Sequence, residues 1–547
     1  MGTQQLKKIE EIAHIIGLND DEFEKYGNYM AKVSLSVLER VKNKKKGKLI
    51  LVTAISPTKE GEGKTTTAIG LAQGFQKLGK KVSIAIREPS LGPCFGIKGG
   101  ATGGGLAKVE PSDRINLIFT SDFPSVSAAH NLLSSMINNH IYFNKEPKLD
   151  PRKVVFPRTV DMNDRSLRDI LVGVGGSETG VLMKDQFIIT AASEIMAIMG
   201  LSSSYKDLKE RLSRILVGYT FDGAPVYASD LNAQGAMAAL LRDALLPNLV
   251  QSTEGVPAFV HIGPFGNIAH GTSSIIADKM ALGLTDYLIT EAGFGSELGA
   301  EKFFDMVSRI GDLPIDAVVI VATIRALKLH SGMQEGKADP VEMLSKGSEN
   351  LLKHVDIIRS FGIDPVVAIN RFPSDTKEEI DKLESILKEK KIEWSLSEGF
   401  AKGGDGTVDL ATKVIKKISA GNASLKRTYA EDEAVKDKIV KIAKQVYGAT
   451  GVVFEKQANR DLRNLSLTGM EKAYVCMAKT QYSVTDDPAK LGWPKDFTVT
   501  VKKISVSSGA GFVVPLLGDI MTMPGLPKIP AAEKIDLTDD GEITGLS

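Results

Sequence analysis

The sequence predicts an α/β protein: a large, mostly parallel sheet domain that contains a P-loop, followed by two smaller α/β domains. Three observations support this fold class. Apolar, β-branched runs alternate with segments of helical apolar spacing. Glycine-rich turns follow several of those runs, and a chain of 547 residues exceeds what one hydrophobic core serves. The predicted domains are 1–345, 346–425 and 426–547.

Composition excludes several classes of protein. Hydrophobic residues make up 43% of the chain and the net charge is only +1, so no overall field attracts nucleic acid or an anionic membrane. The two cysteines, Cys94 and Cys476, form no C-x-x-C pair, which argues against a disulfide framework or a cysteine-based zinc site. No apolar run reaches the roughly 20 residues that span a bilayer. We therefore expect a cytoplasmic protein that binds neither nucleic acid nor membrane.

The first 47 residues are charged and helical in pattern, and the basic run 42–48 ends them. Such a run is typical of a solvated helix end, although a polyanionic ligand would also suit it. The apolar run 49–52 then predicts a buried strand, and 68–78 has the apolar spacing of a helix.

A glycine-rich turn, 53–67, joins that strand to that helix. A turn of this kind aims backbone N–H groups and the positive end of the helix dipole at one point, where a phosphate binds. Lys64 stands where a P-loop lysine reaches the terminal phosphates, and the Thr65 hydroxyl stands where it can hold Mg²⁺. The usual P-loop spacing, G-x-x-x-x-G-K-[ST], has glycine at the position where this chain has Thr58. A solvated lysine in an ordinary turn is the alternative, which the flanking strand and helix disfavour.

The second apolar run, 81–87, predicts a second strand, which gives a parallel, right-handed strand–helix–strand unit. Ligands bind beyond the carboxyl ends of such strands, so Arg87 should lie beside the P-loop, where its planar fork suits a phosphate or carboxylate. A structural ion pair of Arg87, with Glu88 or with another residue, is an equally good alternative. The segment 95–105 contains six glycines in eleven residues and predicts a second anion-facing loop around Lys98, with a flexible linker as the alternative.

The ends of later apolar runs also carry polar residues: His261, Asn267, Glu291, Thr323, Arg325 and Lys328. Together these residues predict one large site along the carboxyl edge of the sheet. For any single one of them, a structural role is the better interpretation. In the second predicted domain, Phe372 and Phe400 could form a slot for a flat heteroaromatic ligand, or could belong to the core. Beyond residue 425 we expect a helix at 431–447 and strands at 497–502 and 505–514.

Together these segments resemble the formate–tetrahydrofolate ligase (formyltetrahydrofolate synthetase) family from about residue 10 to the C-terminus. The family also lacks the first P-loop glycine, which accounts for Thr58. The matching segments are 60–67, 87–93, 96–101, 263–265, 267–271, 290–295, 321–328, 478–482 and 521–527.

The resemblance implies ATP-dependent ligation of formate to N10 of tetrahydrofolate through formyl phosphate, giving 10-formyltetrahydrofolate, ADP and phosphate. It also implies Mg²⁺ near Thr65, activation by a monovalent cation (K⁺ or NH₄⁺) and a homotetramer. The implied catalytic residues are Lys64, Arg87 and Asp122. The nucleotide contacts are Thr58, Lys59, Glu60, Gly61, Glu62, Gly63, Lys64, Thr65, Thr66, Glu88 and Lys98, and the pterin contacts are Phe372, Pro373, Phe400, Lys402 and Gly403.

The chain departs from the family pattern at several positions. Many relatives have tryptophan where this chain has Phe400, and histidines where it has Ile118 and Pro124, so no role of those histidines carries over. Because of these two replacements, one alternative is that the protein is a scaffold that binds folate or nucleotide and has lost its activity. A switch ATPase is a further alternative, because Lys59 stands five positions before Lys64. Such ATPases place acidic residues after the second strand, where this chain has its Arg87 turn.

Overall fold

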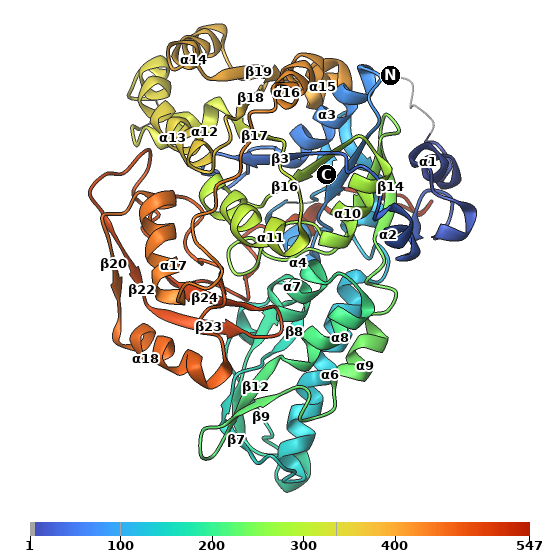
Figure 1. The fold of residues 1–547 in the computed structure, drawn as a ribbon, viewed down its shortest axis with the longest axis vertical. Coiled ribbons are helices and arrows are strands. Elements are labelled where there is room, and N and C mark those ends of the chain that lie inside the picture. Colours follow the sequence, from blue (N-terminus) through green and yellow to red (C-terminus); the bar gives the residue numbers. More distant parts are fainter. Residues whose placement is uncertain (1–5, 99, 335, 547) are drawn as a thin grey trace.

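The computed structural model describes residues 6–98, 100–334 and 336–546. Its centre is a large sheet whose neighbouring strands are parallel from β15 to β19 and antiparallel at the other end (Figure 1). The predicted α/β class with a mostly parallel sheet is confirmed. The strand order is β1 (Phe23–Lys25), β2 (Ala31–Val33), β14 (Asn248–Ser252), β15 (Pro257–Val260), β4 (Val82–Ile86), β16 (Tyr287–Glu291), β3 (Lys48–Ala54), β17 (Ala317–Ala322), β18 (Val366–Asn370) and β19 (Glu393–Ser397), with β5 (Gly103–Gly104) and β6 (Ala107–Glu110) attached at β14.

Helices cover both faces of this sheet, which explains why its strands are continuous apolar runs. In β3, Ile50 and Val52 point to one hydrophobic cluster, whereas Leu49 and Leu51 point to the other. Each side chain buried in this way contributes roughly 1.5–3 kcal/mol relative to an exposed one. The first cluster lies under α3 (Lys64–Lys77) and α16 (Val408–Ala420), and the second under α10 (Ile275–Leu284), α12 (Ile324–His330) and α13 (Pro340–Ser360).

The predicted strand–helix–strand unit is present, with one addition. β3 and β4 are parallel strands of the same sheet, but β16 lies between them and pairs with both. The carboxyl ends of β3, β16 and β4 therefore meet at one edge of the sheet.

A lobe extends from the sheet at the lower end of the molecule (Figure 1). Small sheets and four helices build it, including the long helix α6. Its elements are α6 (Asp122–Tyr142), β7 (Leu149–Val154), β8 (Arg158–Val160), β9 (Ile170–Val172), β10 (Met183–Asp185), β11 (Phe187–Ile189), α7 (Glu194–Leu201), α8 (Tyr205–Ser213), β12 (Leu216–Thr220), β13 (Pro225–Tyr227) and α9 (Gln234–Leu240).

The segment 346–425 continues the central sheet. Residue 345 lies inside α13, and β18 pairs in parallel with β17 and with β19. The C-terminal segment instead forms three small sheets, and the expected strand 505–514 is a hairpin. The segment 346–425 also contains α14 (Lys377–Glu389). The elements of the C-terminal segment that build its first two sheets and flank them are α17 (Val435–Ile442), β20 (Gly451–Phe454), α18 (Lys456–Asn464), β21 (Tyr474–Val475), β22 (Thr498–Val501), β23 (Lys503–Ser507) and β24 (Phe512–Leu516).

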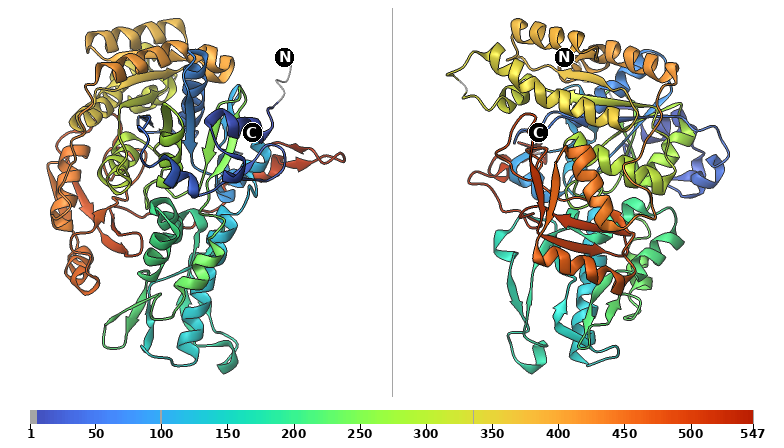
Figure 2. Two further views of the ribbon diagram at one scale, coloured as in Figure 1. Left: turned by 45° about the vertical axis from the view of Figure 1, so that its right-hand side comes forward. Right: turned by 60° about the vertical axis from the view of Figure 1, so that its left-hand side comes forward.

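The first and last described elements lie on the outside of the molecule. Near the N-terminus, α1 (Ile9–Ile16) and α2 (Ser36–Val41) pack beside the antiparallel end of the sheet, and near the C-terminus a hairpin of β25 (Asp536–Leu537) and β26 (Ile543–Thr544) projects from the body (Figure 2). No helix in the described ranges is long and apolar enough to cross a membrane.

Helix α3 carries a second layer of chain on its outer side through two glycines. Thr407 donates its hydroxyl to the Gly70 carbonyl, and a Cβ added at Gly74 would lie 2.7 Å from the Thr407 hydroxyl oxygen and 2.9 Å from its carbonyl. The segment around residue 400, which carries Phe400, is therefore mounted directly on the helix that follows the P-loop.

We expect Gly74→Ala to destabilise the protein by about 1–3 kcal/mol, because the added methyl group meets fixed backbone. Gly235→Ala is the matched control. It also lies in a helix, but its Cβ would meet nothing within 4 Å, so alanine should stabilise by roughly 0.5–1 kcal/mol. Urea unfolding of the two variants measures the difference. A Gly74→Ala variant as stable as the wild type would show that the two layers are not in firm contact.

Candidate functional site

The carboxyl ends of five adjacent strands assemble the candidate site. The order of these strands in the sheet is β4, β16, β3, β17 and β18. The residues that follow or end them, in the same order, are Arg87, Glu291, the P-loop turn, Thr323 with Arg325, and Asn370.

The glycine-rich turn ends in left-handed backbone that glycine adopts easily. Gly61 has φ +83° and Gly63, the residue before helix α3, has φ +70°. A Cβ at Gly63 would lie 2.4 Å from the side-chain nitrogen of Asn370. Lys64 is the first residue of the 14-residue helix α3, so the positive end of the helix lies at the turn as predicted.

The first half of the turn is closed by a carboxylate. Glu62 is only 2% exposed, and its side chain accepts the backbone N–H of Thr58 at 2.6 Å and the hydroxyl of Thr323. Thr323 in turn accepts the N–H of Ala326 and caps helix α12. The Glu62 carboxylate therefore faces the protein, and only its backbone N–H is placed to meet a ligand. Thr58 is one of the nucleotide contacts implied by the family resemblance, and its backbone N–H is already bonded to Glu62.

Arg87 and Thr65 lie on either side of Glu291. The Thr65 hydroxyl donates to the Glu291 carboxylate at 2.9 Å. Arg87 donates from Nη1 to the Pro264 carbonyl at 3.1 Å, while its buried Nε has no hydrogen-bond partner among the described residues. Burial lowers the pKa of Arg87 and the Glu291 carboxylate opposes that shift. A cation with a buried, unbonded donor is suited to receive an anion.

The ion pair between Arg87 and Glu88 is absent from the described part of the chain, which removes that alternative for Arg87. Glu88 is buried and turns away from the P-loop. Its backbone N–H donates to the Ile262 carbonyl, and burial, with the neighbouring Asp122 carboxylate, raises the pKa of the Glu88 carboxyl well above its ordinary value.

Asp122 is fully buried at the start of α6 and bonded only to protein. Its carboxylate lies 2.6 Å from the ammonium of Lys32, and it accepts the backbone N–H of Ile262 and the amide of Asn248. Burial raises the pKa of Asp122, but the charges of Lys32 and His261 together with the hydrogen bonds from Lys32 and Ile262 outweigh burial, and the net shift is downward. Sequence reasoning missed Lys32, although a lysine inside the apolar run 31–33 is a usable signal.

The glycine loop after β4 has a packing role that the sequence did not indicate. A Cβ at Gly105 would lie 2.0 Å from the Phe400 carbonyl, and one at Gly104 would lie 2.9 Å from the Phe400 ring. These glycines let the segment around residue 400 approach closely. The backbone of Lys98 ends a short π-helical turn, while its side chain and residue 99 lie outside the described residues.

The two predicted aromatic residues lie on neighbouring loops. Phe372 follows β18 and Phe400 follows β19, where Phe400 is 59% exposed. Glu398 joins the loops, because its carboxylate accepts from Arg371 at 2.9 Å and from Lys402 at 2.6 Å. No contact between the two rings occurs among the described residues. Pro373 is exposed beside Phe372, and Gly403 ends the Phe400 turn with φ +58°.

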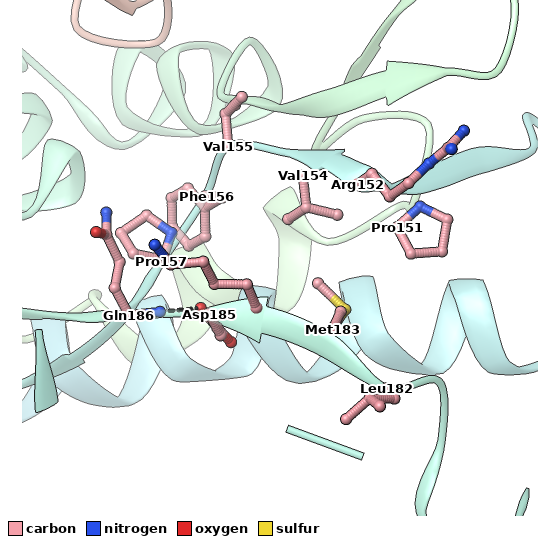
Figure 3. Close-up of a pocket in the computed structure, with 11 residues that line it drawn as sticks. Pro151, Arg152, Val154, Val155, Phe156, Pro157, Leu182, Met183, Asp185 and Gln186 are labelled. Carbon is pink, nitrogen blue, oxygen red and sulfur yellow. Dashed lines mark hydrogen bonds between the residues drawn. The ribbon is translucent and has the colours of Figure 1, made fainter. Parts of the chain in front are cut away.

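A hollow of about 470 Å³ lies on the lobe between β7 and β10, away from the sheet edge (Figure 3). Its apolar wall includes Val154, Phe156 and Met183, which come from both strands. Its charged residues are ion-paired with protein: Arg152 with Asp150, Lys184 with Asp169 and Asp185 with Arg158. This hollow suits packing rather than chemistry.

The fold and the strand-end site define an α/β protein with an anion-binding turn at the carboxyl edge of a parallel sheet. A profile of the formate–tetrahydrofolate ligase family matches residues 2–547. The chain is 65% identical to the formate–tetrahydrofolate ligase of Thermoplasma volcanium and 64% identical to that of Thermoplasma acidophilum, in each case over 99% of this chain and 100% of the relative. The enzyme of that name from Picrophilus torridus is 55% identical over 98% of this chain. The chain belongs to the formate–tetrahydrofolate ligase family and is a ligase.

Asp161 positions the turn that carries Arg87. Its carboxylate accepts the Ser90 hydroxyl at 2.6 Å and the Leu91 backbone N–H at 2.9 Å. Burial raises the pKa of Asp161 to about 6, despite these two bonds.

The folded protein therefore binds a proton at Asp161 more tightly than the unfolded chain, and stability falls as pH rises from about 4 to about 6. Asp161→Asn removes this titration. We expect the unfolding free energy of the variant, relative to the wild type, to increase by roughly 1–2 kcal/mol between pH 5 and pH 8. Urea unfolding at both pH values measures it, and a difference that does not change with pH contradicts the raised pKa.

Proposed function

We propose that the enzyme joins formate to N10 of tetrahydrofolate in an ATP-dependent reaction through formyl phosphate, giving 10-formyltetrahydrofolate, ADP and phosphate. Membership of the ligase family supports the substrates. One observation supports the phosphoryl step: the unbonded, buried donor of Arg87 lies at the strand edge where helix α3 begins with Lys64. A site built to receive an anionic reactant explains why this donor is left without a protein partner.

The first step activates formate, which is a poor electrophile. A formate oxygen attacks the γ-phosphorus of ATP, the bond from that phosphorus to the bridging oxygen breaks, and ADP leaves. Both reactants are anions, so positioned cations supply most of what the protein can contribute. In this proposal Lys64 and Arg87 stabilise the charge that develops on the transferring group.

The second step forms the carbon–nitrogen bond. The N10 lone pair attacks the formyl carbon, the bond from that carbon to the phosphate oxygen breaks, phosphate leaves, and N10 loses its proton. Holding the two reactants together is the main contribution of the protein. We propose that the pterin lies against Phe372 and Phe400, with Pro373, Lys402 and Gly403 around it. Phenylalanine at position 400 keeps an aromatic face for stacking.

The residues near the P-loop include oxygen ligands that suit Mg²⁺. Mg²⁺ prefers oxygen ligands, and the Thr65 hydroxyl with the Glu291 carboxylate provides two next to the phosphate turn. Bound there, Mg²⁺ would neutralise phosphate charge. The described residues contain no group of three or more His, Cys, Asp or Glu side chains arranged for a metal. The K⁺ or NH₄⁺ ion is expected from the family resemblance alone, and we assign no step to it.

The remaining predicted contacts stay proposals of different strength. Lys59, Glu60, Gly61 and Thr66 belong to the turn and the helix start, where they can meet the nucleotide. Glu88 and Asp122 contact each other and surrounding protein in the structure, so we propose that they act by holding the Arg87 turn and the start of α6.

Purified protein supplied with Mg-ATP, formate and tetrahydrofolate should form a product that acid converts to methenyl-tetrahydrofolate, which absorbance detects. ATP hydrolysis that ignores both formate and folate would indicate a switch ATPase. Binding of tetrahydrofolate without any turnover would indicate the inactive scaffold. Either result rejects the proposed function.

Lys64→Ala and Arg87→Ala should each lower turnover by about a hundredfold or more, because each removes a cation from the transferring phosphoryl group. Affinity for tetrahydrofolate, measured by calorimetry, should change little. Loss of folate binding equal to the loss of turnover would show that these residues do not act in the phosphoryl step.

We propose in addition that the enzyme is a homotetramer and that the lobe contributes to its contacts. The β9–β10 hairpin exposes Leu171 (65%) and Leu182 (62%) beside the hollow of Figure 3. Apolar groups gathered in this way on a soluble protein mark contact surfaces. The exposed ion pair between Lys184 and Asp169 places a positive and a negative charge on the same face. A second copy related by a two-fold axis presents the same two charges, so each charge can meet the opposite charge of the other copy.

The double variant Leu171→Glu/Leu182→Glu should sediment as a smaller species than the wild type, because two carboxylates cannot be buried in an apolar contact. Leu467→Glu is the control, since Leu467 is also exposed but lies in the C-terminal segment. Sedimentation velocity measures both. An unchanged double variant would place the subunit contacts elsewhere.

A further inference from the structure

Two consecutive carbonyls of the P-loop turn are bound by side chains that belong to the folate side of the site. The Nη2 of Arg325 donates to the Gly61 carbonyl at 3.0 Å, and the side-chain amide of Asn370 donates to the Glu62 carbonyl at 3.1 Å. Arg325 is in the first turn of α12, after β17, and Asn370 is the last residue of β18.

These two bonds determine where the next two N–H groups point. In a planar trans peptide the carbonyl of one residue and the N–H of the next point in opposite directions. With the Gly61 and Glu62 carbonyls held toward α12 and β18, the N–H groups of Glu62 and Gly63 point away from them, toward the inside of the turn. Arg325 and Asn370 thus orient donors that a phosphate requires.

Arg325 also contacts Phe372, and Asn370 lies close to Phe372 along the chain. The guanidinium carbon of Arg325 lies 5.4 Å from the centre of the Phe372 ring, a cation–π contact. Asn370 stands two residues before Phe372 on the same strand end, and the Phe372 backbone N–H is held by Asp375 at 2.7 Å. No carboxylate forms an ion pair with Arg325 within the described ranges, so the P-loop carbonyl and the aromatic ring are its main partners.

We infer that Arg325 and Asn370 are positioning residues that couple the nucleotide turn to the folate slot, so that each ligand raises the affinity for the other. The inference rests on the proposed function. A pterin stacked on Phe372 restricts the ring, the restricted ring holds the guanidinium, and the guanidinium holds the Gly61 carbonyl. Because coupling between two binding sites is reciprocal, a nucleotide in the turn must favour the pterin by the same factor.

The planar fork of arginine is required for this arrangement. One edge donates to the carbonyl while the flat face lies over the ring, and the compact ammonium of lysine cannot do both in this geometry. Arg325→Gln keeps a donor but loses the charge, and Arg325→Lys keeps the charge but loses the flat face. Both variants should therefore weaken the coupling. Because Arg325 is exposed, neither change leaves a buried cavity.

The test is calorimetric titration of Mg-ADP into the enzyme, without and with saturating tetrahydrofolate, in the absence of formate. We expect tetrahydrofolate to tighten Mg-ADP binding to the wild type by about fivefold or more. In Arg325→Gln and Arg325→Lys this factor should fall below about twofold. Phe372→Leu should reduce it similarly, and Arg325→Gln/Phe372→Leu should reduce it no further, because both substitutions interrupt one chain of contacts.

Arg371→Gln is the matched control. Arg371 adjoins Phe372 and carries the same charge, but it bonds to Glu398 and not to the P-loop, so its loss should leave the coupling factor unchanged. Three results would overturn the inference in an enzyme whose ligase turnover persists. They are a coupling factor that is unchanged in Arg325→Gln, a coupling factor that falls equally in Arg371→Gln, and a wild type that shows no coupling. A wild type that binds no tetrahydrofolate overturns the proposed function instead.

Discussion

The site depends on the requirement that buried backbone polar groups find partners. In the P-loop turn, three backbone groups that face the protein are bonded to side chains. The Thr58 N–H bonds to the Glu62 carboxylate, and the carbonyls of Gly61 and Glu62 bond to Arg325 and Asn370. Because the protein side of the turn is satisfied in this way, the opposite side of its peptides is free to serve a ligand. The turn keeps its shape without the glycine that the common spacing has at position 58.

Much of this architecture could be predicted from the sequence because the signals were local. β3 and β17 are continuous apolar runs, as strands covered on both faces must be, and the run 49–52 was assigned correctly. The glycine turn lies between that strand and α3, and the polar residues after β4, β16 and β17 do meet at one edge. In a parallel sheet the order of the strands is not needed to know that their carboxyl ends share an edge.

The remainder could not be predicted because it depends on contacts between distant segments. Lys32 and Asp122 are 90 positions apart, and no spacing rule links them. Glu62 was expected to contact the nucleotide, whereas its carboxylate bonds to Thr323, which is 261 positions away. The glycines at 103–105 were predicted to face an anion, but the structure shows Phe400 packed on Gly104 and Gly105. In each case the residue type was noticed and its partner was not visible in the sequence.

The glycine face of α3 also fixes the distance between the start of the helix and the segment that carries Phe400. The phosphate end of the helix begins at Lys64, and the segment that carries Phe400 rests on the same helix at Gly70 and Gly74. At 1.5 Å of rise per residue, those contacts stand about 9–15 Å along the axis from the helix start. A helix barely stretches, so under the proposed function α3 fixes the distance between the phosphate site and the Phe400 ring. A substrate whose reacting atom did not match that distance would then not reach the phosphate site.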